Sequence, residues 1–169
     1  MYVFDATPLI YLATVDRLAM LAELPEECVT PRRVYDEVVV DGLEAGHADA
    51  RRVERVVEGD VLTVRPVEAT EPFQRLEAND DLSPADAAVL AKAGSRNGIA
   101  VMDEQYGRDV AAAEGIETRG TAYLVLRSLQ RGVITADEAR ETIDAMVDAG
   151  WYCAPDLYAK LLRRIDDLS

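Results

Sequence analysis

The chain has 169 residues, of which 30% are charged and 49% hydrophobic. This balance indicates one globular domain and excludes a disordered or fibrous protein. Two cysteines, Cys28 and Cys153, and one histidine, His47, exclude a disulfide framework, a cysteine-rich zinc site, an iron–sulfur cluster and any site with two imidazoles. The first residues resemble neither a signal peptide nor a membrane span, so we expect a cytoplasmic protein.

The net charge is −14, and only two of the 18 basic residues, Lys92 and Lys160, are lysines. An acidic chain with few lysines is expected of a halophilic organism, because molar salt shortens the Debye length to about 3 Å and screens the repulsion between carboxylates. The acidity argues against a nucleic-acid substrate but does not exclude one where salt is abundant.

In the first half of the chain, apolar periodicity and turn residues predict short strands alternating with helices. The expected strands are Tyr2–Asp5, Glu27–Thr30 and Val61–Val67. The expected helices are one opened by Thr7 and Pro8 with the Thr7 hydroxyl as its cap, then Asp16–Glu23, Arg32–Val40 and His47–Glu58. Asp41–Gly46 and Val67–Asp81 are expected to be loops.

The second half continues the alternation. A helix capped by Ser83 is expected to run to Ala93, followed by the strand Ile99–Asp103, a helix Glu104–Glu114, a strand near Ile116–Thr118 and a helix Gly120–Arg131. A capping box, Thr135 to Glu138, precedes a helical stripe of Ala139, Ile143, Met146 and Val147, and a last helix from Pro155 is expected to turn Leu157, Leu161, Ile165 and Leu168 inward.

This order of elements predicts an α/β fold, a three-layer α/β/α sandwich around a short, mainly parallel sheet. We expect a single domain over residues 1–169, with a core of about 1–130 and a C-terminal helical extension of about 131–169.

Acidic residues follow two of the predicted strands. Asp5 and Asp103 each come directly after an apolar strand, and ligands of such sheets bind at the carboxyl ends of the strands. Neighbouring parallel strands would bring the two carboxylates to one edge. Each residue can instead simply cap the helix that follows it.

Two further acids occupy positions where a carboxylate is costly. Glu37 shares a helical stripe with Val34 and Val38, although Asp36 competes with it and periodicity does not choose between the two. Asp86 lies in an almost wholly apolar helix, where the pattern Ser83-x-x-Asp86 also fits a capping box.

Four converging carboxylates would repel one another unless a cation lay among them. Oxygen ligands without histidine or cysteine select Mg²⁺ or Mn²⁺, and such ions are used for phosphodiester hydrolysis. The pattern therefore predicts a metal-dependent nuclease.

The same residues resemble the motifs of the PIN-domain family. Val3–Ile10 resembles its opening strand and turn, Val34–Val38 its second motif with Glu37 as the acid, Leu82–Ala91 its third with Asp86, and Val101–Arg108 its fourth with Asp103. The resemblance extends to a prokaryotic subgroup with a C-terminal helical extension that is related to VapC-like toxins.

The resemblance implies an endoribonuclease that binds Mg²⁺ or Mn²⁺ through Asp5, Glu37, Asp86 and Asp103, with Thr7 as a hydrogen-bonding residue near the metal. It also implies an RNA substrate, a homodimer and an antitoxin protein if the chain is a toxin. Arg108, Arg32 and Arg33 are candidate phosphate contacts, because a guanidinium donates two hydrogen bonds at once. The competing hypothesis is a PIN-like module that binds or regulates without hydrolysis.

Overall fold

The computed structural model describes residues 1–169 and is built on a five-stranded sheet, β3-β2-β1-β4-β5, in which every neighbouring pair is parallel. The strands are β1 (Tyr2–Phe4), β2 (Cys28–Pro31), β3 (Thr63–Arg65), β4 (Ile99–Val101) and β5 (Glu117–Arg119). Because all strands run the same way, their carboxyl ends form one edge of the sheet. The predicted α/β fold is confirmed.

The central strand β1 is buried on both faces. Val3 pairs with Val29 of β2 on one side and with Ala100 of β4 on the other, and Val3 and Phe4 are fully buried. Such burial explains why β1 and its neighbour β4 are short continuous apolar runs, whereas β3 and β5 at the sides of the sheet carry polar residues.

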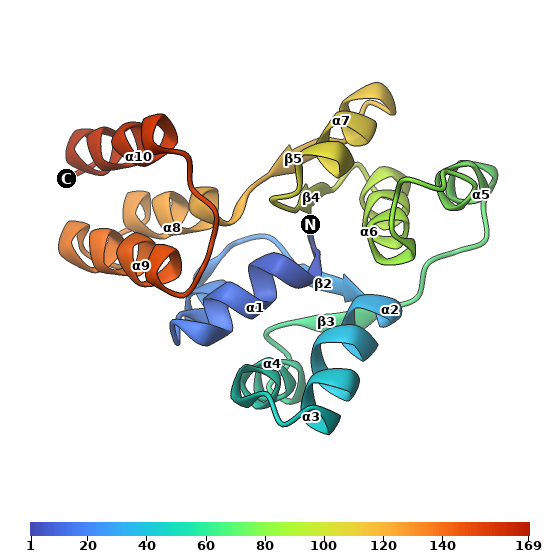
Figure 1. Cartoon of the computed structure of the whole chain (residues 1–169), viewed down its shortest axis with the longest axis horizontal. Coiled ribbons are helices and arrows are strands. Elements are labelled where there is room, and N and C mark those ends of the chain that lie inside the picture. Colours follow the sequence, from blue (N-terminus) through green and yellow to red (C-terminus); the bar gives the residue numbers. More distant parts are fainter.

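Helices flank both faces of this sheet (Figure 1). They are α1 (Ala6–Thr14), the 3-10 helix η1 (Leu18–Glu23), α2 (Arg32–Tyr35), the π-helical turn η2 (Asp36–Asp41), α3 (Gly42–Glu44), α4 (Ala48–Glu58), α5 (Glu71–Glu77), α6 (Pro84–Ser95), α7 (Gln105–Ala113), α8 (Thr121–Gln130), α9 (Ala136–Asp148) and α10 (Pro155–Asp167). Helix α6 packs against β1, β2 and β4, whereas α8, α9 and α10 pack on one another.

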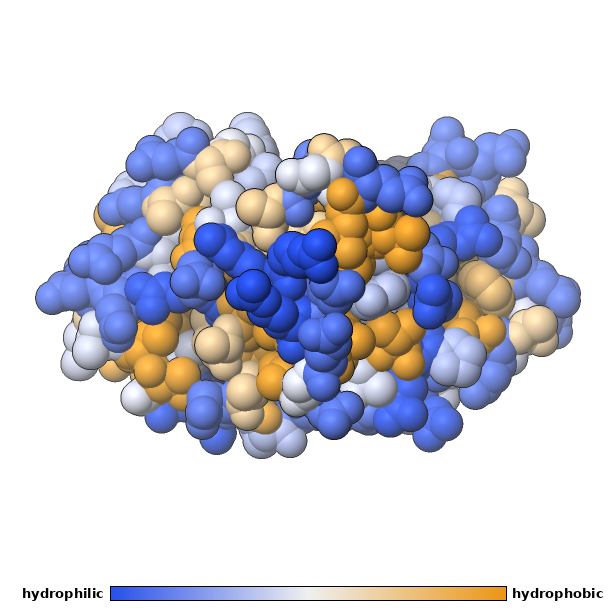
Figure 2. All heavy atoms as spheres, turned by 90° about the horizontal axis from the view of Figure 1, so that it is seen from below, coloured by the Kyte–Doolittle hydropathy of each residue, from blue (hydrophilic) through white to orange (hydrophobic).

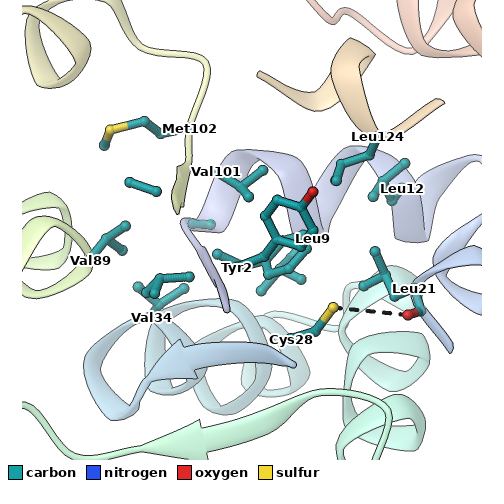
Figure 3. Close-up of a cluster of buried hydrophobic side chains, with 14 of the residues drawn as sticks. Tyr2, Leu9, Leu12, Leu21, Cys28, Val34, Val89, Val101, Met102 and Leu124 are labelled. Carbon is teal, nitrogen blue, oxygen red and sulfur yellow. Dashed lines mark hydrogen bonds between the residues drawn. The ribbon is translucent and has the colours of Figure 1, made fainter. Parts of the chain in front are cut away.

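The core joins the sheet to these helices. Figure 3 shows Tyr2, Leu9 and Leu12 packed near Leu124 of α8, with Val34 and Val89 farther along the same cluster. Burial of this kind stabilises a fold by about 25 cal/mol for each Å² of apolar surface removed from water. The core therefore fixes where the strand ends lie.

Several local predictions were wrong. Helix α1 begins at Ala6 with Asp5 at the N-cap position, so Thr7 lies inside the first turn and is not the cap; the strand ends at Phe4, and the chain turns at once into the helix. The expected loop Val67–Asp81 contains α5, which Thr70 caps. Val147 and Leu157 are 37% and 41% exposed rather than buried.

No helix has both the length and the apolar character needed to cross a membrane.

Candidate active site at the carboxyl edge of the sheet

Asp5 lies at the middle of the carboxyl edge. Its backbone N–H donates to the Val101 carbonyl at 3.0 Å, which joins the end of β1 to β4, and the buried Thr30 hydroxyl donates to the Phe4 carbonyl at 2.9 Å from the β2 side. The Asp5 residue is only 5% exposed. The sheet thus holds a carboxylate in a largely dehydrated position, which is costly unless something offsets its charge.

A wide helical turn brings Glu37 to this edge. Helices α2 and α3 are joined through the π-turn η2, and a turn of this kind often occurs at functional sites. The consecutive residues Val38 and Val39 of this turn are both buried. Asp36 forms an ion pair with Arg32 at 2.8 Å, whereas Glu37 is influenced by the charge of Asp86. The structure thus distinguishes Asp36 from Glu37, between which periodicity could not choose.

Asp86 enters from α6. The Ser83 hydroxyl caps this helix by accepting the Asp86 backbone N–H at 3.0 Å, as predicted. The reciprocal bond of a capping box is absent here, unlike at Thr135 and Glu138, where both bonds form. The Asp86 carboxylate is therefore not used to cap its helix, and its charge acts on Asp5 instead.

These three acids, Asp5, Glu37 and Asp86, form an electrostatic cluster that we call the acid cluster. Burial, followed by the charges of Asp86 and Glu37, raises the pKa of Asp5 to about 8. Burial and the charge of Asp86 likewise raise the pKa of Glu37. Like charges brought together in this way favour protonation or the binding of a cation.

Asp103, the fourth predicted acid, has a different set of partners. One carboxylate oxygen accepts the Thr121 backbone N–H at 2.7 Å, and the other accepts the Thr121 hydroxyl at 2.6 Å and the Trp151 indole N–H at 3.1 Å. Three donors therefore hold Asp103 against the start of α8 and the segment before α10. The next residue, Glu104, caps α7 through the N–H groups of Tyr106 and Gly107.

We expect Thr121→Val to lower the free energy of unfolding by about 1–3 kcal/mol, because Thr121 is fully buried and the change removes a hydrogen bond to a charged group. Thermal denaturation measures the loss, with Thr63→Val, a half-buried strand residue outside the site, as the control. An unchanged melting temperature in Thr121→Val would show that this bond does not stabilise the fold.

The candidate phosphate contacts lie on both sides of the acid cluster. Arg32 and Arg33 line a hollow of about 410 Å³ beyond the end of β2, and Arg32 also lies over the Tyr35 ring. Thr7 and Arg108 line a second hollow together with Asp103. Figure 2 shows the molecule from the side on which α4 lies in Figure 1. This face is mainly hydrophilic, with hydrophobic patches between the polar side chains.

The donors of the acid cluster fit a hard divalent cation, because all of them are carboxylate oxygens and the central one is buried beside two like charges. As the side chains lie, no three His, Cys, Asp or Glu residues are grouped as ready-made metal ligands. Asp5, Glu37 and Asp86 would be the residues to hold a cation, and Asp103, the fourth predicted ligand, is oriented by Thr121 and Trp151.

The fold and this acidic edge define a class: a parallel α/β domain with carboxylates gathered where the strands end. A family model described as PIN domain matches residues 1–167, and the chain belongs to the PIN-domain family. PIN domains are generally nucleases that use divalent metals. No curated protein and no solved structure matches the chain.

Sequence reasoning missed the aromatic and polar partners of the fourth acid. Thr121 and Trp151 follow Asp103 by 18 and 48 residues, and no local periodicity connects them. One signal was present: the consecutive aromatic residues Trp151 and Tyr152 stand between two amphipathic helices, outside the apolar stripe of either helix.

Proposed function

We propose that this chain is a metal-dependent endoribonuclease that hydrolyses RNA phosphodiester bonds at the acid cluster. The observation that supports this most directly is the convergence of Asp5, which follows β1, with Glu37 of η2 and Asp86 of α6, and the pKa of buried Asp5, which is raised to about 8. A fold without use for a cation would gain stability by replacing such a residue.

In this mechanism, Asp5, Glu37 and Asp86 would hold Mg²⁺ or Mn²⁺ through their carboxylate oxygens. The chemistry that such ions supply is activation of a water molecule and stabilisation of the leaving oxygen. Thr7, which lies beside the second hollow, positions a polar group at the substrate side of Asp5. Arg33 and Arg108, on opposite sides of the cluster, bind the phosphates that flank the cut.

Cleavage of a mixed single-stranded RNA pool tests the proposal. The purified protein is incubated with Mn²⁺, Mg²⁺ or a chelator, from low to molar KCl, beside Asp5→Asn and the matched control Asp36→Asn. We expect cutting only with the ion, its loss in Asp5→Asn and its retention in Asp36→Asn, because Asp36 is paired with Arg32.

Absence of cutting at every salt concentration would favour the hypothesis of a binding or regulatory module. Equal cutting by Asp5→Asn would place the reaction elsewhere. The role of toxin, with an antitoxin partner, is a narrower proposal that depends on this activity first being present.

A further inference from the structure

The second hollow, which Thr7 and Asp103 help to line, has a volume of about 740 Å³, which is within the range of small-molecule sites. Its walls come from the end of β5, the start of α7 and α8, and the segment between α9 and α10. Thr7 and Asp103 form its border toward the acids. The hollow therefore opens at the β4 and β5 end of the edge on which Asp5 lies.

Aromatic side chains form one wall. Tyr152 is 85% exposed and lines this hollow. Trp151 next to it is buried and is tied to Asp103 through its indole N–H. Leu157 and Leu161 of α10 and Ala122 of α8 supply apolar surface. A flat, apolar group can therefore stack against this wall.

Cationic side chains form another part of the hollow. The guanidinium of Arg119 lies 5.1 Å from the Tyr123 ring and pairs with Glu117. Arg108 pairs with no carboxylate, and one of its guanidinium nitrogens and an Asp103 oxygen both lie within 3.3 Å of the point where a β-carbon on Gly120 would stand. The lack of a side chain at Gly120 thus leaves room for Arg108 to reach the hollow.

Neither acid at this end, Asp103 or Glu104, forms an ion pair with Arg108. The oxygens of Asp103 accept three hydrogen bonds, and those of Glu104 accept two backbone N–H groups. The donors of Arg108 remain available to an anion from outside, in a chain whose net charge is −14. A ligand with both a flat ring and a phosphate matches this combination of groups.

We propose that this hollow binds one unpaired nucleotide of single-stranded RNA, with its base stacked on Tyr152 and its phosphate on Arg108. The proposal rests on the proposed ribonuclease function and names the form of substrate that the site accepts. A base within a duplex cannot turn its face to Tyr152, so single-stranded RNA is preferred over double-stranded RNA.

The only tryptophan of the chain, Trp151, lies in the wall of this hollow and reports on its occupancy. A ten-nucleotide single-stranded RNA of mixed sequence is titrated into the protein with chelator present, so that binding is observed without cleavage. The fluorescence of Trp151 and the anisotropy of a labelled RNA are measured together. Duplex RNA of the same sequence is the competitor.

We expect the RNA to change the Trp151 fluorescence and the duplex to compete weakly. Tyr152→Ala should weaken binding about fivefold to a hundredfold, the range for loss of one base stack, whereas Tyr152→Phe retains the ring and should bind as the wild type does. Arg108→Gln should weaken binding and reduce its salt dependence. Arg163→Gln, an exposed arginine of α10 outside the hollow, is the matched control and should have no effect.

Two results overturn the proposal: no change in Trp151 fluorescence with any RNA, or equal affinity in Tyr152→Ala, Arg108→Gln and the wild type. Either result leaves the ribonuclease function intact if metal-dependent cutting occurs and requires Asp5. Conversely, Tyr152-dependent binding without cutting in any metal would support the nucleotide site and contradict the ribonuclease.

Discussion

Asp5→Asn should make the metal-free protein more stable at pH 8, with a melting temperature higher by on the order of 10 °C. Burial and the charges of Asp86 and Glu37 raise the pKa of Asp5 to about 8 from an ordinary value of 3.8. One unit of pKa shift corresponds to about 1.4 kcal/mol. The ionised carboxylate therefore costs the folded state about 3–5 kcal/mol, and a protein of this size changes its melting temperature by roughly 2–4 °C for each kcal/mol.

The sign of this effect depends on pH. The folded protein keeps a proton on Asp5 that the unfolded chain releases near pH 3.8, so the wild type loses stability as the pH rises from about 4 to about 8. The advantage of Asp5→Asn should accordingly be small at pH 4 and largest at pH 8. Thermal denaturation in chelator across this range measures it.

Asp36→Asn is the matched control for this experiment, because Asp36 lies beside Glu37 but is paired with Arg32 at 2.8 Å. A half-exposed pair of this kind contributes at most about 1 kcal/mol, so the control should remain close to the wild type at every pH. If Asp5→Asn melts at or below the wild-type temperature at pH 8, the acid cluster is not under the electrostatic strain that we infer.

Asp86→Asn and Glu37→Gln should each reduce RNA cleavage about a hundredfold to a thousandfold while the protein stays folded. Both substitutions keep the shape of the side chain and remove one charged ligand, and the loss of one charge-stabilising group at a reacting centre commonly has this magnitude. Initial rates with saturating Mn²⁺ measure the effect, and far-ultraviolet circular dichroism shows that the fold is retained.

The same cleavage assay distinguishes the role of Glu37 from that of the neighbouring Asp36. Glu37 is influenced by Asp86, whereas Asp36 pairs with Arg32, so Asp36→Asn should cut at a rate within a few fold of the wild type. Equal losses in Glu37→Gln and Asp36→Asn would mean that the π-turn η2 presents both residues to the substrate, in contradiction to the assignment.

Sequence alone predicted the position of Asp5 well, because an apolar strand followed by an acid is a local pattern and the carboxyl ends of parallel strands meet. Periodicity could not choose between Asp36 and Glu37, and only the resemblance to the PIN-domain family pointed to Glu37. That choice depends on the neighbours that each side chain meets: Asp36 pairs with Arg32, whereas the charge of Asp86, which comes from another helix, acts on Glu37. A periodic pattern within one helix does not contain the position of Asp86.

The partners of Asp103 could not be predicted from the sequence. Its place after β4 follows from the sequence, but its partners Thr121 and Trp151 belong to α8 and the segment before α10. Tertiary packing, rather than any local motif, determines that this carboxylate is held by three donors. The lining of the second hollow likewise depends on tertiary packing, because the packing of α9 and α10 determines where Trp151 and Tyr152 lie.

Direct calorimetric titration of Mn²⁺ tests the central claim, that Asp5, Glu37 and Asp86 form a cation site. We predict saturable binding in the wild type and Asp36→Asn that is lost in Asp5→Asn. Because Asp5 must release its proton, the affinity should fall about tenfold for each pH unit below pH 8. Binding that is unchanged in Asp5→Asn, or no heat beyond that of a matched KCl titration, would contradict the account.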